Sequence, residues 1–232
     1  MLFAHVVKTD TFNVVHLSRM PMSIDATHAA DFAPAAPARP LIHPLWVRLT
    51  HWINAAAIIV MVGSGWEIYN ASPLFAFVFP PPVTLGRWLA GGLLLHFAAM
   101  WVLAVNGLVY LVLGVASGRF RRKLVPIRAS QLLADVRAAL MGTLARTDPL
   151  VYNAVQRLFY VGVILASILV VLSGLAIWKP VQLQELTAVF GGYDAARYVH
   201  FFAMAIIVAF TVLHVSMALL VPRSLRAMIT GR

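Results

Sequence analysis

The sequence carries no charged side chain between Arg197 and Arg223, a stretch long enough to cross a membrane. A helix needs about 20 predominantly apolar residues to span the hydrocarbon core of a bilayer. Other stretches have the same character, so the sequence predicts four membrane spans, at about 46–66, 88–115, 158–178 and 198–221. Because 61% of the residues are hydrophobic and only 11% are charged, the chain is too apolar for an ordinary soluble domain. The predicted fold class is all-α, a transmembrane four-helix bundle.

Lysine and arginine are distributed unevenly around these predicted spans. The segment through Arg48, the 118–157 loop and the C-terminal tail together hold 15 of the 18, and the opposite side holds only Arg87, Lys179 and Arg197. By the positive-inside rule, both termini are expected in the cytoplasm. The net charge of +10 is therefore mainly a topology signal that also favours anionic lipid, and no nucleic-acid partner is expected.

Two segments outside the spans have recognisable patterns. Residues 1–40 contain no membrane-length apolar run and are expected to form a flexible N-terminal extension, which leaves 41–232 as the membrane domain. Within the cytoplasmic loop, SQLLADVRAALMGTLAR predicts an amphipathic helix on the membrane surface, and a plain connector helix explains it equally well. Its apolar stripe comprises Leu132, Leu133, Val136, Leu140 and Leu144.

Histidines are the ionisable residues that enter the predicted spans. The chain has no cysteine, so any metal ion must be held by histidine, methionine or carboxylate side chains. His200 and His214 are separated by fourteen residues, which is about 21 Å along a helix and within about 40° of the same face. One metal ion cannot bridge that distance, so the spacing predicts two separate sites stacked across the membrane.

Depth along the spans predicts a partner for each of these histidines. His51 enters the first span from the cytoplasm and matches His214, whereas His96 lies in the outer part of the second span and matches His200. We call His51 and His214 the inner pair, and His96 and His200 the outer pair. Two histidines facing each other at one depth can be the axial ligands of a b-type haem in a helical bundle. The sequence therefore predicts two bis-histidine haems b, with these four residues as iron ligands.

Two arginines are predicted to contact the haem propionates. Arg48 precedes His51 by three residues, and Arg197 precedes His200 by three, so each arginine shares a helix face with its histidine. A guanidinium there could neutralise a propionate, which is costly without compensation in hydrocarbon. The alternative is that both arginines only anchor the ends of their spans at the interface.

The first and third predicted spans resemble each other. VRLTHWINAAAIIVMVGSGWEIY aligns with QRLFYVGVILASILVVLSGLAIW at a constant offset of 109. The offset brings Ser64-Gly65 onto Ser173-Gly174 and His51 onto Tyr160. This favours two duplicated helix hairpins, although convergence between apolar helices could explain part of the likeness.

A haem-free proton-coupled carrier is the main competing explanation for intramembrane histidines. Such a carrier normally has buried carboxylates as well. The nearest acidic residues, Glu67 and Asp194, lie at the membrane edges, which favours haem. His43, eight residues before His51, is interpreted as interfacial.

Several motifs resemble the bacterial dihaem cytochrome b561 superfamily: RLTHWIN, GGLLLHFAAMW, SGLAIWKPVQLQ, GGYDAARYVHFFAM and LHVSMALLVPRSL. The likeness covers residues 41–232 and is closest to the cytochrome b membrane subunits of thiosulfate reductase, nickel–iron hydrogenase and formate dehydrogenase. It implies two haems b at the positions of His51, His96, His200 and His214, and a quinone site. It also implies a location in the bacterial inner membrane, with a catalytic redox partner of molybdopterin or hydrogenase type at the periplasmic face.

These observations predict an electron-transfer subunit between the quinone pool and a periplasmic oxidoreductase. Imidazoles in both axial positions leave the iron no open site for substrate, so no substrate catalysis is expected from this chain. The alternatives are an autonomous quinone-reducing cytochrome b561 that uses superoxide or another small donor, and the haem-free carrier. Asn54, Asn106 and Tyr160 are polar groups available for a quinone or for bonds between helices.

The predicted periplasmic segment 70–86 is unusually apolar. Phe75, Phe77 and Phe79 alternate, so in extended form they project from one side, and three prolines follow them. Exposed apolar surface commonly marks an interaction site, which favours docking of the partner here. The alternative is that the segment folds onto the lipid interface or covers the outer haem.

Overall fold

Four long helices dominate the computed structural model, which describes residues 41–124, 128–141 and 153–231. They are α2 (Leu45–Ala71), α3 (Leu89–Ala116), α6 (Ala154–Trp178) and α8 (Tyr193–Leu220). Each is long and apolar enough to cross a membrane, and no strand occurs within those described ranges. The predicted all-α fold with four spans is confirmed. The N-terminal extension predicted for 1–40 lies outside the described residues.

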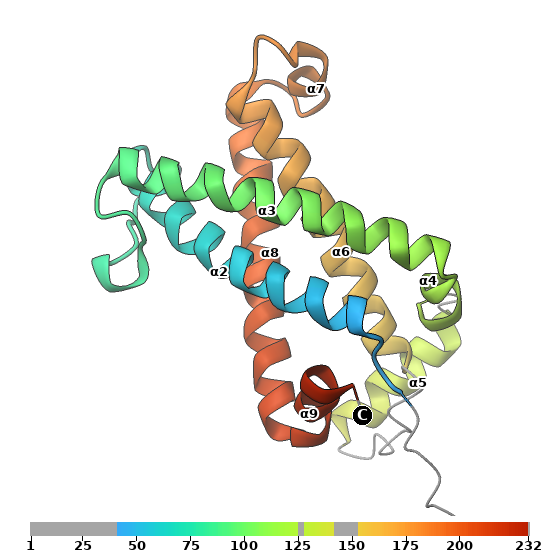
Figure 1. The fold of residues 1–232 in the computed structure, drawn as a ribbon. Helices are drawn as coiled ribbons and strands as arrows, with labels where there is room; N and C mark the ends of the chain where they lie inside the picture. Colours follow the sequence, from blue (N-terminus) through green and yellow to red (C-terminus); the bar gives the residue numbers. More distant parts are fainter. Residues whose placement is uncertain (1–40, 125–127, 142–152, 232) are drawn as a thin grey trace, which may run out of the picture. The chain divides into compact units, whose positions relative to one another are not determined.

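The four helices form two hairpins, in which α2 packs along α3 and α6 packs along α8 (Figure 1). Helices of different hairpins approach each other much less closely than the two helices within one hairpin. Most of the buried residues along the four helices are small, which allows close approach of backbones in a membrane bundle. They include Ala57, Ser64, Gly92, Ala99, Ala166, Ser173, Ala176, Ala196 and Ala203.

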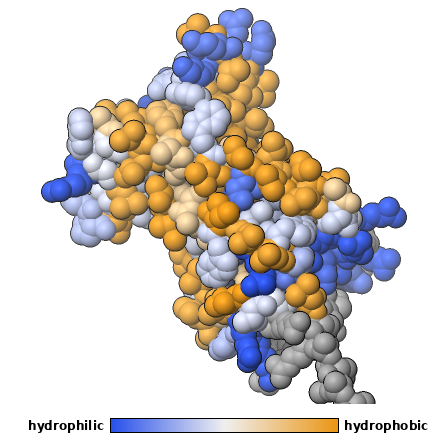
Figure 2. Space-filling view, in the orientation of Figure 1, coloured by the Kyte–Doolittle hydropathy of each residue, from blue (hydrophilic) through white to orange (hydrophobic). Residues whose placement is uncertain are grey.

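Large apolar side chains face outward from these helices, where lipid would cover them. Leu94 of α3 is 73% exposed, Val115 70% and Leu165 of α6 60%. Figure 2 shows apolar side chains over the long helices and hydrophilic ones gathered near α4 and α7. This distribution is inverted relative to a soluble bundle, as a hydrocarbon environment requires.

Short elements lie between and after the spans. They are η1 (Pro81–Val83), α4 (Arg119–Lys123), α5 (Ala129–Leu140), α7 (Gln184–Val189) and α9 (Pro222–Thr230). The predicted loop helix corresponds to α5, where Leu133 and Val136 are exposed, and Leu144 of its predicted stripe lies outside the described residues. Asp135 accepts a hydrogen bond from the backbone N–H of Ala154 at 2.7 Å, which ties α5 to the start of α6.

Three spans extend beyond the apolar stretches that predict them. Helix α6 begins at Ala154 because Asn153 and Gln156 form a capping box, which satisfies backbone N–H groups of the first turn. Helix α2 continues past Trp66 to Ala71, and α8 begins at Tyr193, after Gly192 with its positive φ of 101°. Hydropathy detects the hydrocarbon-facing length of a helix, whereas capping residues set where the helix ends.

The last helix returns to the start of α2. The backbone N–H of Ile42 donates to the carbonyl of Gly231 at 2.9 Å, and the indole Nε1 of Trp52 donates to the carbonyl of Met228 at 3.4 Å. The guanidinium of Arg48 donates to the carbonyl of Ile229. The bonds to Met228 and Ile229 satisfy carbonyls in the last turn of α9, which have no partner within the helix, and the bond to Gly231 ties the residue after the helix to the start of α2.

Candidate functional site

The four intramembrane histidines meet in two pairs across the hairpins. In the outer pair, His96 of α3 and His200 of α8 have ring centres 6.4 Å apart and planes inclined at 64°. In the inner pair, His51 of α2 and His214 of α8 have ring centres 5.9 Å apart and planes inclined at 66°. The structure thus brings together the same partners that depth along the sequence predicts.

These separations fit two imidazoles bound to opposite sides of one metal ion. An imidazole nitrogen binds a metal ion at about 2.0 Å, so its ring centre lies about 3 Å from the ion. Two such rings on opposite sides have centres about 6 Å apart, close to the distances of both pairs. Two histidines per site match the axial ligation of a b-type haem, in which the porphyrin supplies the remaining ligands. In the described part of the chain, no group of three or more His, Asp or Glu residues forms a protein-only metal site.

Each ring of the outer pair is held by a buried serine. The Oγ of Ser64 lies 3.1 Å from Nδ1 of His96, and the Oγ of Ser173 lies 3.2 Å from Nδ1 of His200. Both serines are 0% exposed. The Nδ1 atoms are therefore occupied by protein, which leaves the Nε2 atoms for a ligand.

A glycine follows each of these serines and lies against the same ring. A Cβ atom at Gly65 would lie 3.3 Å from Cε1 of His96, and one at Gly174 would lie 3.1 Å from Cε1 of His200. Both distances are tighter than ordinary van der Waals contact. The glycines therefore leave room for the imidazoles, so Ser-Gly has the same role in α2 and in α6.

The inner pair is surrounded by aromatic rings instead. Trp52 meets His51 edge-on with ring centres 5.2 Å apart, and Phe210 stacks on His214 at 5.5 Å. Among the residues that the structure describes, neither inner imidazole has a hydrogen-bond partner. Packing, rather than a hydroxyl group, orients these rings.

The two arginines predicted to contact propionates already have protein partners. Arg197 donates to the carbonyl of Ser72 at 2.5 Å and to its Oγ at 3.1 Å, so it joins the start of α8 to the end of α2. Arg48 donates to the carbonyl of Ile229, but its Nε is buried without a hydrogen-bond partner. An unsatisfied guanidinium donor on the same helix, three residues before His51, fits an anionic group near that end of α2.

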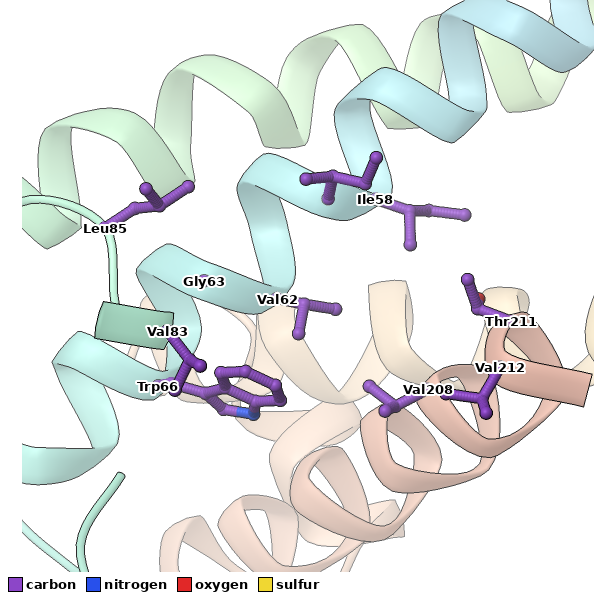
Figure 3. Close-up of a pocket in the computed structure, with 10 residues that line it drawn as sticks. Ile58, Val62, Gly63, Trp66, Val83, Leu85, Val208, Thr211 and Val212 are labelled. Atoms are coloured by element: carbon purple, nitrogen blue, oxygen red, sulfur yellow. The ribbon is translucent and has the colours of Figure 1, made fainter. Parts of the chain in front are cut away.

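An apolar cavity of about 310 Å³ opens between α2 and α8 (Figure 3). Val62 and Trp66 of α2 line it opposite Val208 and Thr211 of α8. A smaller space of about 40 Å³ touches both outer histidines and shares Val62 with the larger cavity. The indole Nε1 of Trp66 is buried without a partner. Apolar space with one free donor beside the outer pair fits a flat, largely hydrophobic group.

Two asparagines of the spans, and His43 just before α2, have protein partners. The amide of Asn106 donates to Oδ1 of Asn54 and to the carbonyl of Thr50, both at 2.8 Å, so this pair ties α3 to α2. His43 lies before α2, where Arg119 donates to its Nδ1 at 3.1 Å. These contacts give structural roles to two asparagines that the sequence leaves available to a quinone.

Comparison with known proteins adds evidence of descent. Residues 42–231 match the family model described as prokaryotic cytochrome b561. The chain is 51% identical over 190 residues to a protein of Azospira oryzae named "Putative protein-methionine-sulfoxide reductase subunit YedZ1". That alignment covers 82% of this chain and 96% of the relative.

Proposed function

Because the chain belongs to the prokaryotic cytochrome b561 family and is a membrane cytochrome b, we propose that it carries two haems b and transfers electrons between the quinone pool and a periplasmic oxidoreductase. The observation that carries this proposal is the presence of two histidine pairs at two depths, with ring centres 6.4 and 5.9 Å apart. Bound haems would supply one-electron redox chemistry at these two depths.

The residues that would hold the haems follow from the two pairs. His96 and His200 would ligate the outer iron, and His51 and His214 the inner iron. With an imidazole bound on each side, a haem iron would keep no open position for a substrate, so substrate chemistry would belong to the partner. Apolar side chains line the space beside the outer histidines, and such surroundings influence the reduction potential of a bound metal.

Arg48 and Arg197 are proposed to contact the propionates. The buried, unpartnered Nε of Arg48 supports this role at the inner pair. Support at the outer pair is weaker, because Arg197 already donates to two oxygens of Ser72. A propionate there would have to share the guanidinium, whose five N–H donors allow several acceptors.

The partner is proposed to be a reductase that acts on oxidised methionine in proteins. The relative from Azospira oryzae is named as a subunit of a protein-methionine-sulfoxide reductase, and it is 51% identical to this chain over nearly its whole length. This favours a reductase over a hydrogenase among the partners implied by the sequence. Electrons would then run from quinol in the membrane to the partner.

The direct test is the cofactor content of purified protein. We expect two haems b per chain with low-spin, six-coordinate visible spectra. His96→Ala or His200→Ala should remove one haem, and His51→Ala or His214→Ala the other, whereas the control His43→Ala should retain both. Protein without haem would overturn the proposal, and loss of the same haem in His96→Ala and His51→Ala would overturn the pairing.

A further inference from the structure

The outer pair is supported by two hydrogen-bond arrangements that repeat each other. In α2, Ser64 Oγ lies 2.6 Å from the carbonyl of Val60 and 3.1 Å from Nδ1 of His96. In α6, Ser173 Oγ lies 2.7 Å from the carbonyl of Leu169 and 3.2 Å from Nδ1 of His200. The corresponding residues of the two helices differ by 109 in number, the same offset that relates the two copies of the repeat.

The donors and acceptors determine where the imidazole proton lies. A serine hydroxyl has one hydrogen and two lone pairs, and the short distance to the carbonyl four residues earlier assigns that hydrogen to the carbonyl. The serine oxygen can then only accept, so Nδ1 of each outer histidine must carry the proton. Each serine oxygen also lies 3.3 Å from the carbonyl three residues earlier, that of Met61 or Val170, at positions again related by the offset of 109.

We propose that Ser64 and Ser173 are positioning residues for the outer haem: they fix both ligands in the Nδ1–H tautomer and lower the reduction potential of that haem. The inference rests on the proposed dihaem function. A ligand histidine that donates its other N–H becomes more basic and is held in one orientation. A more electron-donating imidazole stabilises the oxidised, more positively charged iron, so the potential falls.

The inner pair provides the comparison within the same molecule. Among the described residues, His51 and His214 have no hydrogen-bond partner, and Tyr160 stands where the repeat would place a second histidine matching His51. The serine effect is therefore confined to the haem nearer the proposed periplasmic partner. Because the two serine contacts have nearly equal length, the two serines should contribute nearly equally.

The test is a redox titration of Ser64→Ala and Ser173→Ala, followed by visible absorbance. Loss of a hydrogen bond to a metal-ligating side chain typically changes metal affinity 10–100-fold. We expect each variant to raise the equilibrium constant for reduction of the outer haem about tenfold. This corresponds to a reduction potential about 59 mV higher for one electron. The potential of the inner haem should not move. The electron paramagnetic resonance signal of the outer haem should also shift, because the freed ring can rotate.

Matched controls separate this role from a general packing effect. Ser167→Ala, in the same helix as Ser173, removes a hydroxyl that donates to the carbonyl of Val163 at 2.7 Å but has no histidine contact, and it should leave both potentials unchanged. Ser64→Thr keeps the hydroxyl and its bond to the preceding turn, so the outer haem of this variant should keep the wild-type potential. Either serine suffices for the test if the variant at the other position does not fold.

The outcomes distinguish this inference from the proposed function. Wild-type protein with two haems, together with an outer potential and resonance signal that do not move in either alanine variant, would overturn the serine role alone. Equal shifts of both haems would also overturn it, because the contacts are confined to the outer pair. Wild-type protein without haem would overturn the proposed function itself.

Discussion

At the scale of single residues, His43 has surroundings unlike those of the four paired histidines. It lies before α2, outside the membrane-spanning helices, and Arg119 donates to its Nδ1 at 3.1 Å. Burial, followed by the positive charges of Arg119 and Lys123, lowers the pKa of His43 to about 4. The residue is therefore neutral in the folded protein and accepts a hydrogen bond from arginine.

This lowered pKa predicts a loss of stability in mild acid. In the unfolded chain the histidine has a pKa of 6.5, so between pH 6.5 and about 4 the unfolded state binds more protons than the folded state. The contribution of His43 to the free energy of unfolding is fully present above pH 6.5 and is lost as the pH is lowered through that window. His43→Asn keeps an acceptor for Arg119 but cannot titrate. Its Tm should fall less between pH 7 and pH 5 than the Tm of wild type, and an equal fall in both would contradict the assignment.

At the scale of elements, aromatic stacking holds the loop between α2 and α3 against α8. Phe75 and Phe77 stack on each other at 6.0 Å, and both lie within 6.4 Å of the ring of Phe201. Phe79 stacks on Trp66 at 4.6 Å. The loop is therefore anchored next to His200, although Phe75 remains 37% exposed and Phe77 47%. This packing favours a covering role for the loop, and the exposed parts of the two rings still offer a surface to a partner.

Replacing Phe75, Phe77 and Phe79 together by serine should lower Tm, because each aromatic pair contributes about 0.5–1.5 kcal/mol beyond area burial. The absorbance of the outer haem should also change if the loop covers it. Val78→Ser, an exposed position in the same loop, is the matched control and should change neither property. Unchanged haem spectra combined with loss of partner co-purification would instead assign the loop to docking.

At the scale of the whole membrane domain, the two hairpins contribute to the two histidine pairs in different ways. The outer pair joins equivalent positions of the two hairpins, since His96 lies against Ser64 and His200 against Ser173. The inner pair has no such symmetry, because it takes His51 from the first helix of one hairpin and His214 from the second helix of the other. Close backbone approach between the long helices of different hairpins is sparse, so bound haems would add to the cohesion that the end-of-helix and loop contacts provide.

The distribution of basic residues predicts the orientation of this domain. Fifteen of the 18 lysines and arginines lie on the side of the termini, so both termini should be cytoplasmic. A reporter active only in the cytoplasm should work when fused after Arg232, and a periplasmic reporter should work when inserted near Pro81. The opposite pattern would exchange the inner and outer assignments and move the proposed partner to the other face.

The sequence by itself determined the membrane class, the four spans and the family. Apolar stretches of this length have no other stable environment, and the motifs around the four histidines are specific enough for the cytochrome b561 resemblance that the family match confirms. It also predicted which histidines face each other, because a helix converts residue spacing directly into depth. The N-terminal extension and the haem-ligand roles stay predictions.

Only the tertiary structure decided which side chains meet across helices. Ser-Gly is visible twice in the sequence, but its contact with the outer imidazoles depends on how α2 and α6 are rotated against α3 and α8. Asn54 and Asn106 could each serve a ligand, and packing of α2 on α3 directs them to each other instead. Alternation places three phenylalanines on one side of a loop, and the position of α8 brings two of them, Phe75 and Phe77, against Phe201. Spacing along a helix fixes depth and face, but contacts between helices also require their relative rotation, which only packing sets.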